Sequence, residues 1–215
     1  MPKSSRFIPV SFPVVELFES VQGEGANSGL YVAFLRLGGC NLACPWCDTD
    51  SSIAEMLDVE TILNRLSAFL VRRLVLTGGE PLIQPSLDIL LTHLKQAEYW
   101  IALETNGLID PAPPLRQKFD YISASPKAYA AVDYLESRMI SQADEVRIVV
   151  DGDVFSFCKR MRHQITATHY FLSPCTRNGK MNVEETLELL KRLNADEHER
   201  PWRLSLQLHK LIGIR

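Results

Sequence analysis

Three cysteines are crowded into one stretch of this chain, Cys40-Asn41-Leu42-Ala43-Cys44-Pro45-Trp46-Cys47, and are separated by three and then two residues. Thiolates are the soft ligands that hold iron in iron–sulfur clusters. A closed structural zinc or cluster site needs a fourth Cys or His ligand, and the flanking residues offer none. The stretch therefore predicts a cluster with three protein ligands and one open iron that can bind a small molecule.

Around this loop, the chain alternates strands, turns and helices, which is typical of a parallel α/β sheet. The chain has 215 residues, and single domains commonly reach about 250. We therefore expect one domain over residues 1–215. Only three or four helices are convincing, so we expect a partial, open, shortened TIM-like barrel rather than a complete one. The expected strands are 12–20, 31–37, 73–77, 100–105, 121–125, 145–150, 168–172 and 202–208. The expected helices follow Asp58 to about Leu70, follow the cap Ser86, cover 155–161, and follow an Asn182/Glu185 capping box.

The polar stretches of the chain come directly after the predicted strands. Because ligands bind at the carboxyl ends of the strands in parallel α/β architectures, these stretches predict one shared site. They are Cys40–Cys47, Gly78-Gly79-Glu80, Glu104-Thr105-Asn106, Ser125-Pro126-Lys127 and Ser173–Thr176.

The composition argues against several classes of partner. A net charge of −3 and a sequence pI near 6.0 disfavour a nucleic-acid surface, which needs a concentrated basic patch. No apolar run approaches the roughly 20 residues that span a bilayer, and the first residues lack a signal peptide's apolar stretch. We expect a cytoplasmic protein with no membrane or direct nucleic-acid partner. Outside the loop, Cys158 and Cys175 are expected to be small buried thiols.

Two motifs together resemble the radical S-adenosylmethionine superfamily. They are the three-cysteine loop, with Trp46 before its last cysteine, and Gly78-Gly79-Glu80-Pro81 after the next strand. The resemblance implies a 4Fe–4S cluster on Cys40, Cys44 and Cys47. It also implies that the open iron binds the amino and carboxylate groups of S-adenosylmethionine, whose reductive cleavage gives a 5′-deoxyadenosyl radical.

Four further stretches resemble the 7-carboxy-7-deazaguanine synthase family of queuosine biosynthesis. They are 16–25 (ELFESVQGEG), Cys47-Asp48-Thr49, Ser125-Pro126-Lys127 and 205–210 (SLQLHK). This resemblance covers nearly the whole chain. It implies a lyase that converts 6-carboxy-5,6,7,8-tetrahydropterin to 7-carboxy-7-deazaguanine with release of ammonia. It further implies Mg²⁺, a shortened barrel, a homodimer, and an electron donor such as flavodoxin.

The family resemblance also implies roles for individual residues. Thr49 is the expected Mg²⁺ ligand, and no catalytic side chain is expected beyond the cluster and the cofactor site. The residues expected to bind the pterin are Gln22, Gly23, Glu24, Arg36, Thr77, His209 and Arg215. The residues expected near S-adenosylmethionine are Trp46, Cys47, Asp48, Gly79, Glu80, Ser125, Pro126, Lys127, Ser173 and Thr176. The stretch Ser173–Thr176 matches by position alone, because family members carry a Gln-Pro-Met-Asp type of run there.

The residues taken singly also allow plainer interpretations. Arg36 fits a salt bridge within the core as well as a ligand contact, and His209 fits a structural hydrogen bond. Glu80 and Thr49 could cap turns, and Lys127 could be a solvated charge. At the level of function, the alternatives are an activating enzyme that installs a glycyl radical on a partner protein, and a binding module stapled by zinc or a cluster. Iron, sulfide and zinc analysis separates the module from the enzymes.

Overall fold

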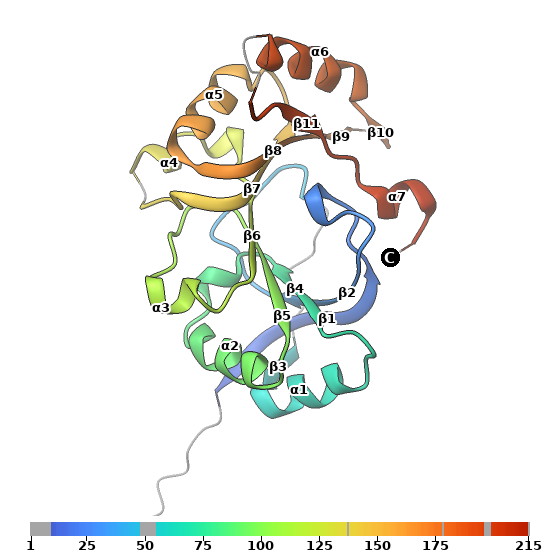
Figure 1. The fold of residues 1–215 in the computed structure, drawn as a ribbon, viewed down its shortest axis with the longest axis vertical. Helices are drawn as coiled ribbons and strands as arrows, with labels where there is room; N and C mark the ends of the chain where they lie inside the picture. Colours follow the sequence, from blue (N-terminus) through green and yellow to red (C-terminus); the bar gives the residue numbers. More distant parts are fainter. Residues whose placement is uncertain (1–9, 48–54, 137, 178, 196–198, 215) are drawn as a thin grey trace, which may run out of the picture.

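One curved, nine-stranded sheet organises the fold (Figure 1). The computed structural model describes residues 10–47, 55–136, 138–177, 179–195 and 199–214. The strand order is β11-β8-β7-β6-β5-β4-β2-β1-β3. The strands of this sheet are β1 (Ser11–Val21), β2 (Tyr31–Leu37), β3 (Glu55–Asp58), β4 (Arg73–Gly78), β5 (Trp100–Thr105), β6 (Tyr121–Ala124), β7 (Gln142–Val150), β8 (Thr166–Pro174) and β11 (Trp202–Leu204). A separate hairpin pairs β9 (Thr176–Arg177) with β10 (Lys180–Met181).

The predicted partial barrel with mostly parallel strands is confirmed. Within the nine-stranded sheet, every described neighbouring pair from β2 through β4, β5, β6, β7 and β8 to β11 is parallel, and the pairings of β1 with β2 and with β3 are antiparallel. The two terminal strands of the sheet, β3 and β11, do not pair in the described part of the chain, so the barrel is open.

Helices cover the convex side of the sheet, where most of the apolar core lies (Figure 1). The longer helices are α1 (Val59–Ser67), α2 (Leu87–Gln96), α5 (Phe155–Gln164) and α6 (Val183–Asn194). The short ones are α3 (Pro113–Arg116), α4 (Asp133–Glu136), α7 (Leu208–Ile212) and the 3₁₀ turns η1 (Gly25–Asn27), η2 (Pro81–Ile83) and η3 (Ala128–Ala130). The predicted cap Asp58 is confirmed, because its carboxylate accepts from the Thr61 amide at 2.8 Å. Apolar residues recur at helical spacing and are buried in α1 and α2, which supplies the burial that stabilises such helices.

The concave face of the sheet differs from the convex face. Side chains alternate between the two faces of a strand, and the registers place Phe34, Val75 and Ala102 together in a small apolar cluster. The residues two positions further along these strands are Arg36, Thr77 and Glu104, which are polar. The concave side is therefore apolar near the amino ends of the strands and polar near their carboxyl ends.

Two backbones approach each other closely at the end of β4. The Gly79 amide donates to the Leu37 carbonyl at 2.9 Å, and the Glu80 amide donates to the Gly39 carbonyl at 2.9 Å. A Cβ atom at Gly78 would overlap the Leu37 carbonyl, and one at Gly79 would overlap the Gly39 carbonyl. Gly78 also has a φ of +135°, which L side chains rarely adopt. Both positions therefore require glycine.

The structure corrects three predicted features and adds one strand. The last strand ends at Leu204 rather than Leu208, because Ser205 turns to accept the Gly25 amide and the chain then forms α7. Ser86 precedes α2 but makes no side-chain cap; its φ of 62° is left-handed, whereas capping residues have an extended backbone. Asn182 does not cap the first amides of α6, since its side-chain carbonyl accepts from the Cys175 amide; its side-chain amide does donate to the predicted partner Glu185 at 2.8 Å. The short strand β3 was not predicted, and it forms by pairing with the start of β1.

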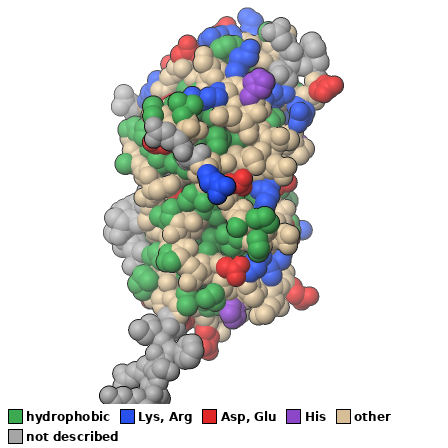
Figure 2. Space-filling model, turned by 90° about the vertical axis from the view of Figure 1, so that its left-hand side faces the viewer, with side chains coloured by type: hydrophobic (Ala, Val, Ile, Leu, Met, Phe, Trp, Pro, Cys, Tyr) green, Lys and Arg blue, Asp and Glu red, His purple; other side chains and the backbone are tan. Residues whose placement is uncertain are grey.

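The surface mixes charges of both signs. On the face in Figure 2, the Lys and Arg side chains of the described residues lie among acidic and apolar ones. Within the described residues, no helix is both long and apolar enough to cross a bilayer.

The glycine requirement gives a first testable prediction. Gly79→Ala should destabilise the fold by about 1–3 kcal/mol, because a methyl group must be fitted against a backbone carbonyl. Thermal unfolding followed by circular dichroism measures this. Gly152→Ala is the matched control, because nothing lies within 4 Å of a Cβ there. Equal melting temperatures for the two variants would contradict the close approach.

Candidate functional site

The cysteine loop lies on the rim formed by the carboxyl ends of the parallel strands. Cys40 and Cys47 are exposed and Cys44 is partly exposed, all as free thiols. The loop folds on itself, because the Cys47 amide donates to the Cys44 carbonyl at 3.1 Å and the Leu42 amide points at the Cys40 sulfur at 3.4 Å. Three thiols are thus presented to the rim within a single short loop.

Glu80 ties the glycine turn to the cysteine loop from inside the protein. Its side chain is fully buried and accepts from the Leu82 amide (3.0 Å), the Thr105 hydroxyl (2.9 Å) and the Asn106 amide (2.7 Å). The Asn106 side chain in turn donates to the Asn41 side chain at 2.7 Å. Burial raises the pKa of the Glu80 carboxyl, although these hydrogen bonds oppose the shift. Glu80 therefore does cap the following turn, and it also orders the end of β5.

A second tether joins the loop to the ends of β6 and β7. The Trp46 indole donates to the Asp151 carboxylate at 3.0 Å. The Lys127 ammonium lies 5.4 Å from the centre of the Trp46 ring and donates to the Ser125 hydroxyl at 2.7 Å. Burial lowers the pKa of Lys127. Lys127 is therefore held within the site and is not a solvated surface charge.

A buried group of charges lies on the concave face. The Arg147 guanidinium, on β7, contacts the carboxylates of Glu24 (3.3 Å), Glu145 (3.2 Å) and Glu104. Glu104 also accepts from the Gln22 side chain at 2.9 Å. Burial raises the pKa of Glu104, and the Arg147 charge opposes that shift. We call these five residues the carboxylate cluster.

The turn between β1 and β2 carries Gln22 and Glu24 across the interior of the barrel. Its Gly25 amide donates to the Ser205 hydroxyl at 2.9 Å, and its Ala26 amide donates to Glu145 at 2.8 Å. The turn thus bridges from β1 to β7 and to the residue that follows β11. The Leu208 amide at the start of α7 donates to the Gly23 carbonyl at 3.0 Å, and the His209 ring packs so closely on Gly23 that a Cβ there would overlap it.

Arg36 and Thr77 lie side by side as partners in the β2–β4 register. The Arg36 guanidinium also forms a 2.6 Å ion pair with Glu16 on β1, and about a fifth of each side chain remains exposed. Arg36 therefore forms the predicted salt bridge and still lies next to the polar end of the concave face.

The remaining predicted site residues differ in their surroundings. The Ser173 hydroxyl, at the end of β8, is buried and has no hydrogen-bond partner among the described residues. Pro126 is buried beside Ser125, whereas Thr176 is exposed in β9, outside the main sheet. Asp48, Thr49 and Arg215 lie outside the described residues. Cys158 and Cys175 are buried, as predicted.

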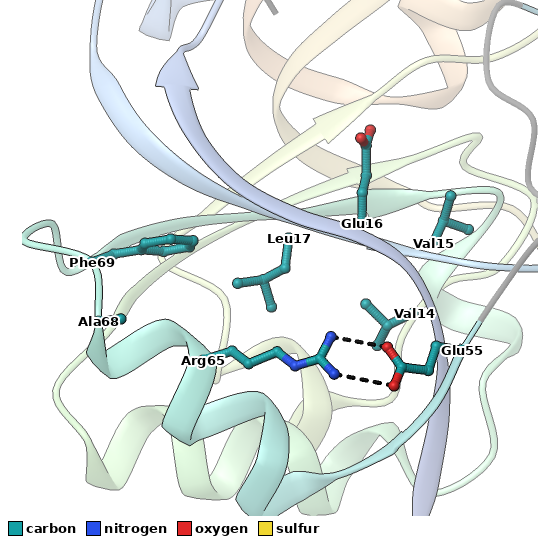
Figure 3. Close-up of a pocket in the computed structure, with 8 residues that line it drawn as sticks. All are labelled: Val14, Val15, Glu16, Leu17, Glu55, Arg65, Ala68 and Phe69. Atoms are coloured by element: carbon teal, nitrogen blue, oxygen red, sulfur yellow. Dashed lines mark hydrogen bonds and ion pairs between the residues drawn. The ribbon is translucent and has the colours of Figure 1, made fainter.

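A separate hollow lies away from this site. Leu17, Phe69 and the bidentate Arg65–Glu55 ion pair line it on the α1 side of β1, and Glu16 points away from it (Figure 3). The rim and the concave face hold the predicted site residues, and this hollow does not.

Comparisons with known proteins agree with the site. Residues 35–132 match the model of the radical SAM superfamily. The chain is 50% identical over 204 residues to a 7-carboxy-7-deazaguanine synthase of Neisseria meningitidis, covering 94% of both chains. It is 46% identical over 214 residues to the enzyme of that name from Haemophilus influenzae, covering 100% of this chain and 99% of the other. This chain belongs to the 7-carboxy-7-deazaguanine synthase family.

The crystal structure of QueE from Escherichia coli has the same fold. It superposes with a TM-score of 0.67 at 24% identity, covering 93% of this chain and 95% of the other.

The residues of this 7-carboxy-7-deazaguanine synthase family member fit the cofactors that a radical SAM enzyme uses. The described residues contain no group of three His, Cys, Asp or Glu side chains arranged around a single metal ion. The three thiols of the cysteine loop have the donor chemistry that holds iron–sulfur clusters. The Ser173 hydroxyl, which has no partner among the described residues, and the paired Lys127 and Ser125 place further polar groups on the same rim.

Sequence reasoning missed two residues of the carboxylate cluster, Glu145 and Arg147. Both lie in a strand that was interpreted as a structural element, whereas Glu104 was placed among the predicted site stretches without a role of its own. The available signal was the charge pattern Glu-Val-Arg inside the otherwise apolar run 145–150, because charges in such runs must be paired or face a cavity.

The buried Glu80 carboxylate gives a second testable prediction. Glu80→Gln should lower the free energy of unfolding of the cluster-free protein by about 1–3 kcal/mol, because an amide leaves a buried N–H without its acceptor. Urea unfolding measures the change, with Glu188→Gln on the exposed face of α6 as the control. Unfolding midpoints that are the same for both variants would refute the tether.

Proposed function

We propose that this protein is a radical S-adenosylmethionine lyase that converts 6-carboxy-5,6,7,8-tetrahydropterin to 7-carboxy-7-deazaguanine with release of ammonia. The main support for this proposal is that the cysteine loop and the carboxylate cluster lie on the same side of the sheet. The three-cysteine loop lies on the rim, and the carboxylate cluster lies on the concave face beside Arg36 and Thr77. The family membership supports the same reaction.

The cofactors would be held by the rim. Cys40, Cys44 and Cys47 would bind the 4Fe–4S cluster, and S-adenosylmethionine would lie along Trp46, Gly79, Ser125, Lys127 and Ser173. When bound, the cluster and S-adenosylmethionine supply the radical that removes a hydrogen atom from the substrate. The buried Glu80 would act from behind, by holding Asn106 and through it Asn41 of the loop.

The concave face would bind the pterin. The aminopyrimidinone edge of a pterin presents N–H donors, which the Glu24 carboxylate and the Gln22 side-chain carbonyl can accept. Arg36 can donate to the substrate carboxylate, since its guanidinium is charged and shaped for carboxylates. His209 is held over Gly23 next to the same residues. These contacts would orient the pterin with its reduced ring toward the rim.

Three further properties complete the proposal, and each has its own check. Thr49 would be a ligand of Mg²⁺, a hard ion that prefers oxygen ligands, and chelation of Mg²⁺ should then lower turnover. The enzyme would be a homodimer, which sedimentation of the clustered protein tests. A flavodoxin-type protein would supply the electron, and this can be tested by replacing the chemical reductant with flavodoxin and its reductase. The chain would act as a single radical S-adenosylmethionine domain.

Anaerobic turnover tests the proposed function directly. Fully clustered protein is supplied with S-adenosylmethionine, Mg²⁺, a strong reductant and the carboxy-tetrahydropterin, and the products are analysed by mass spectrometry. We expect 7-carboxy-7-deazaguanine and ammonia. Cleavage of S-adenosylmethionine without any deazaguanine would refute the proposal and favour an enzyme that installs a glycyl radical on a partner protein. Zinc at one per chain, with no iron after reconstitution, would favour a metal-stapled module.

A cysteine variant gives a third testable prediction. Cys44→Ala should abolish iron binding and S-adenosylmethionine cleavage, because one of three thiolate ligands is lost. Far-UV circular dichroism should remain unchanged, since Cys44 is partly exposed on the rim and is not a residue of the apolar core. Cys158→Ala, which removes a buried thiol in α5 away from the rim, should keep iron and cleavage. Persistent cleavage in Cys44→Ala would rule out the open-iron site.

A further inference from the structure

Arg147 is the one cation of the carboxylate cluster, and it contacts all three of the cluster's carboxylates. Its residue is 4% exposed. Its two terminal nitrogens reach Glu24 from the β1–β2 turn, Glu104 from β5 and Glu145 from its own strand. A buried guanidinium with several carboxylate partners is held in one orientation, because each contact restrains the fork of N–H groups.

The same contacts fix the residues that are proposed to bind the pterin. Glu24 is contacted directly by Arg147. Gln22 is linked to Arg147 through Glu104, because the Gln22 side-chain amide donates to the Glu104 carboxylate at 2.9 Å. The side-chain carbonyl of Gln22 accepts from the backbone amide of Glu24 at 3.3 Å. Three elements that are distant in sequence thus meet at one guanidinium. A movement of Arg147 would therefore also move Gln22 and Glu24, the residues proposed to accept hydrogen bonds from the pterin.

A structural role for Arg147 has a weaker basis than a positioning role. Glu145 already accepts from the Ser123 hydroxyl (2.8 Å), the Tyr121 hydroxyl (3.0 Å) and the Ala26 amide (2.8 Å). Its carboxylate therefore stays satisfied without Arg147. Glu24 and Glu104 depend more on Arg147. In the described part of the chain, Glu104 has one further donor, the Gln22 side-chain amide, and the Glu24 carboxylate is contacted by Arg147.

We propose that Arg147 is a positioning residue for pterin recognition, which orients the Glu24 and Glu104 carboxylates toward the N–H donors of the substrate. This inference rests on the proposed function. Arg147 acts through these carboxylates and does not itself contact the reacting atoms.

Removal of the guanidinium would change the charge balance as well as the geometry. The charged groups that face one another here are Glu24, Glu104, Glu145 and Arg147, with Lys127 as the next cation and the Tyr121 hydroxyl on Glu145. Burial already raises the pKa of Glu104, and Arg147 opposes this. Without Arg147 the pKa of Glu104 should rise further, so Glu104 should take up a proton at a higher pH. A protonated carboxyl accepts the substrate's N–H groups less well, so recognition should be lost at a higher pH as the solution is acidified.

The test compares Arg147→Met and Arg147→Lys with the wild type. The KM for the pterin should rise roughly 10- to 100-fold in Arg147→Met, the loss expected when hydrogen bonds to a charged group are misplaced. The KM for S-adenosylmethionine and its cleavage in the absence of pterin should stay unchanged. The acid limb of the pH profile of kcat/KM should move to higher pH. Arg147→Lys keeps the charge but cannot bridge three carboxylates, so its pterin KM should rise by a smaller factor.

A binding measurement separates this inference from turnover. Cluster-free protein is titrated with fluorescent 6-carboxypterin, and the Kd should rise in both Arg147 variants. Arg203→Met is the matched control, because that guanidinium lies on β11 over the Phe171 ring, 5.2 Å from its centre, and outside the cluster. Its Kd should equal that of the wild type.

The outcomes are distinguishable. If the wild type neither binds the pterin nor forms deazaguanine, the proposed function fails. If the wild type does both, and the variants show a lower melting temperature with an unchanged pterin KM and Kd, Arg147 is merely structural and the inference is overturned. If Arg147→Met does not fold, Arg147→Lys decides alone, and a wild-type KM, Kd and pH profile in that variant overturn the inference.

Discussion

The site depends on one close contact between two stretches of backbone. Gly78 and Gly79 lie against the residues that lead from β2 into the cysteine loop, with two amide-to-carbonyl hydrogen bonds of 2.9 Å. No side chain fits at either glycine. Because the contact is made by backbone alone, it sets the cysteine loop at a fixed distance from the end of β4. It also directs the next residue, Glu80, into the interior, where that carboxylate orders the end of β5.

The polar groups behind this rim form two sets with different tasks. The Trp46, Lys127 and Asp151 contacts hold the loop from the side of β6 and β7. The carboxylate cluster lies deeper, and it joins the β1–β2 turn to β5 and β7 around Arg147. Burying so many charges is costly unless each is paired, and here one guanidinium compensates several carboxylates. Such an arrangement is well suited to hold hydrogen-bond acceptors ready for a substrate that presents several N–H donors.

The sequence predicts the parts of this structure that depend on local patterns. The apolar run 100–105 predicts a strand, and the apolar stripe after Asp58 predicts a helix. The cysteine spacing and the glycine-glycine-glutamate turn predict which residues lie on the rim. The parts that depend on tertiary contacts are not predictable in this way. The last strand ends just before Ser205, whose hydroxyl accepts from the amide of Gly25 near the other end of the chain. The Asn182 side chain accepts from the Cys175 amide and does not cap α6. Arg147 and Glu104 look like strand residues until the sheet brings them together.

The proposed chemistry depends on three cysteines that leave one iron of the cluster open for S-adenosylmethionine. Electron nuclear double resonance on the reduced, fully clustered protein tests it most directly, with S-adenosylmethionine that carries nitrogen-15 in its amino group. If the open iron binds the amino group, we expect a nitrogen-15 hyperfine coupling to the cluster, and this coupling should disappear when S-adenosylmethionine is omitted. A reduced cluster with bound S-adenosylmethionine and no such coupling would contradict it.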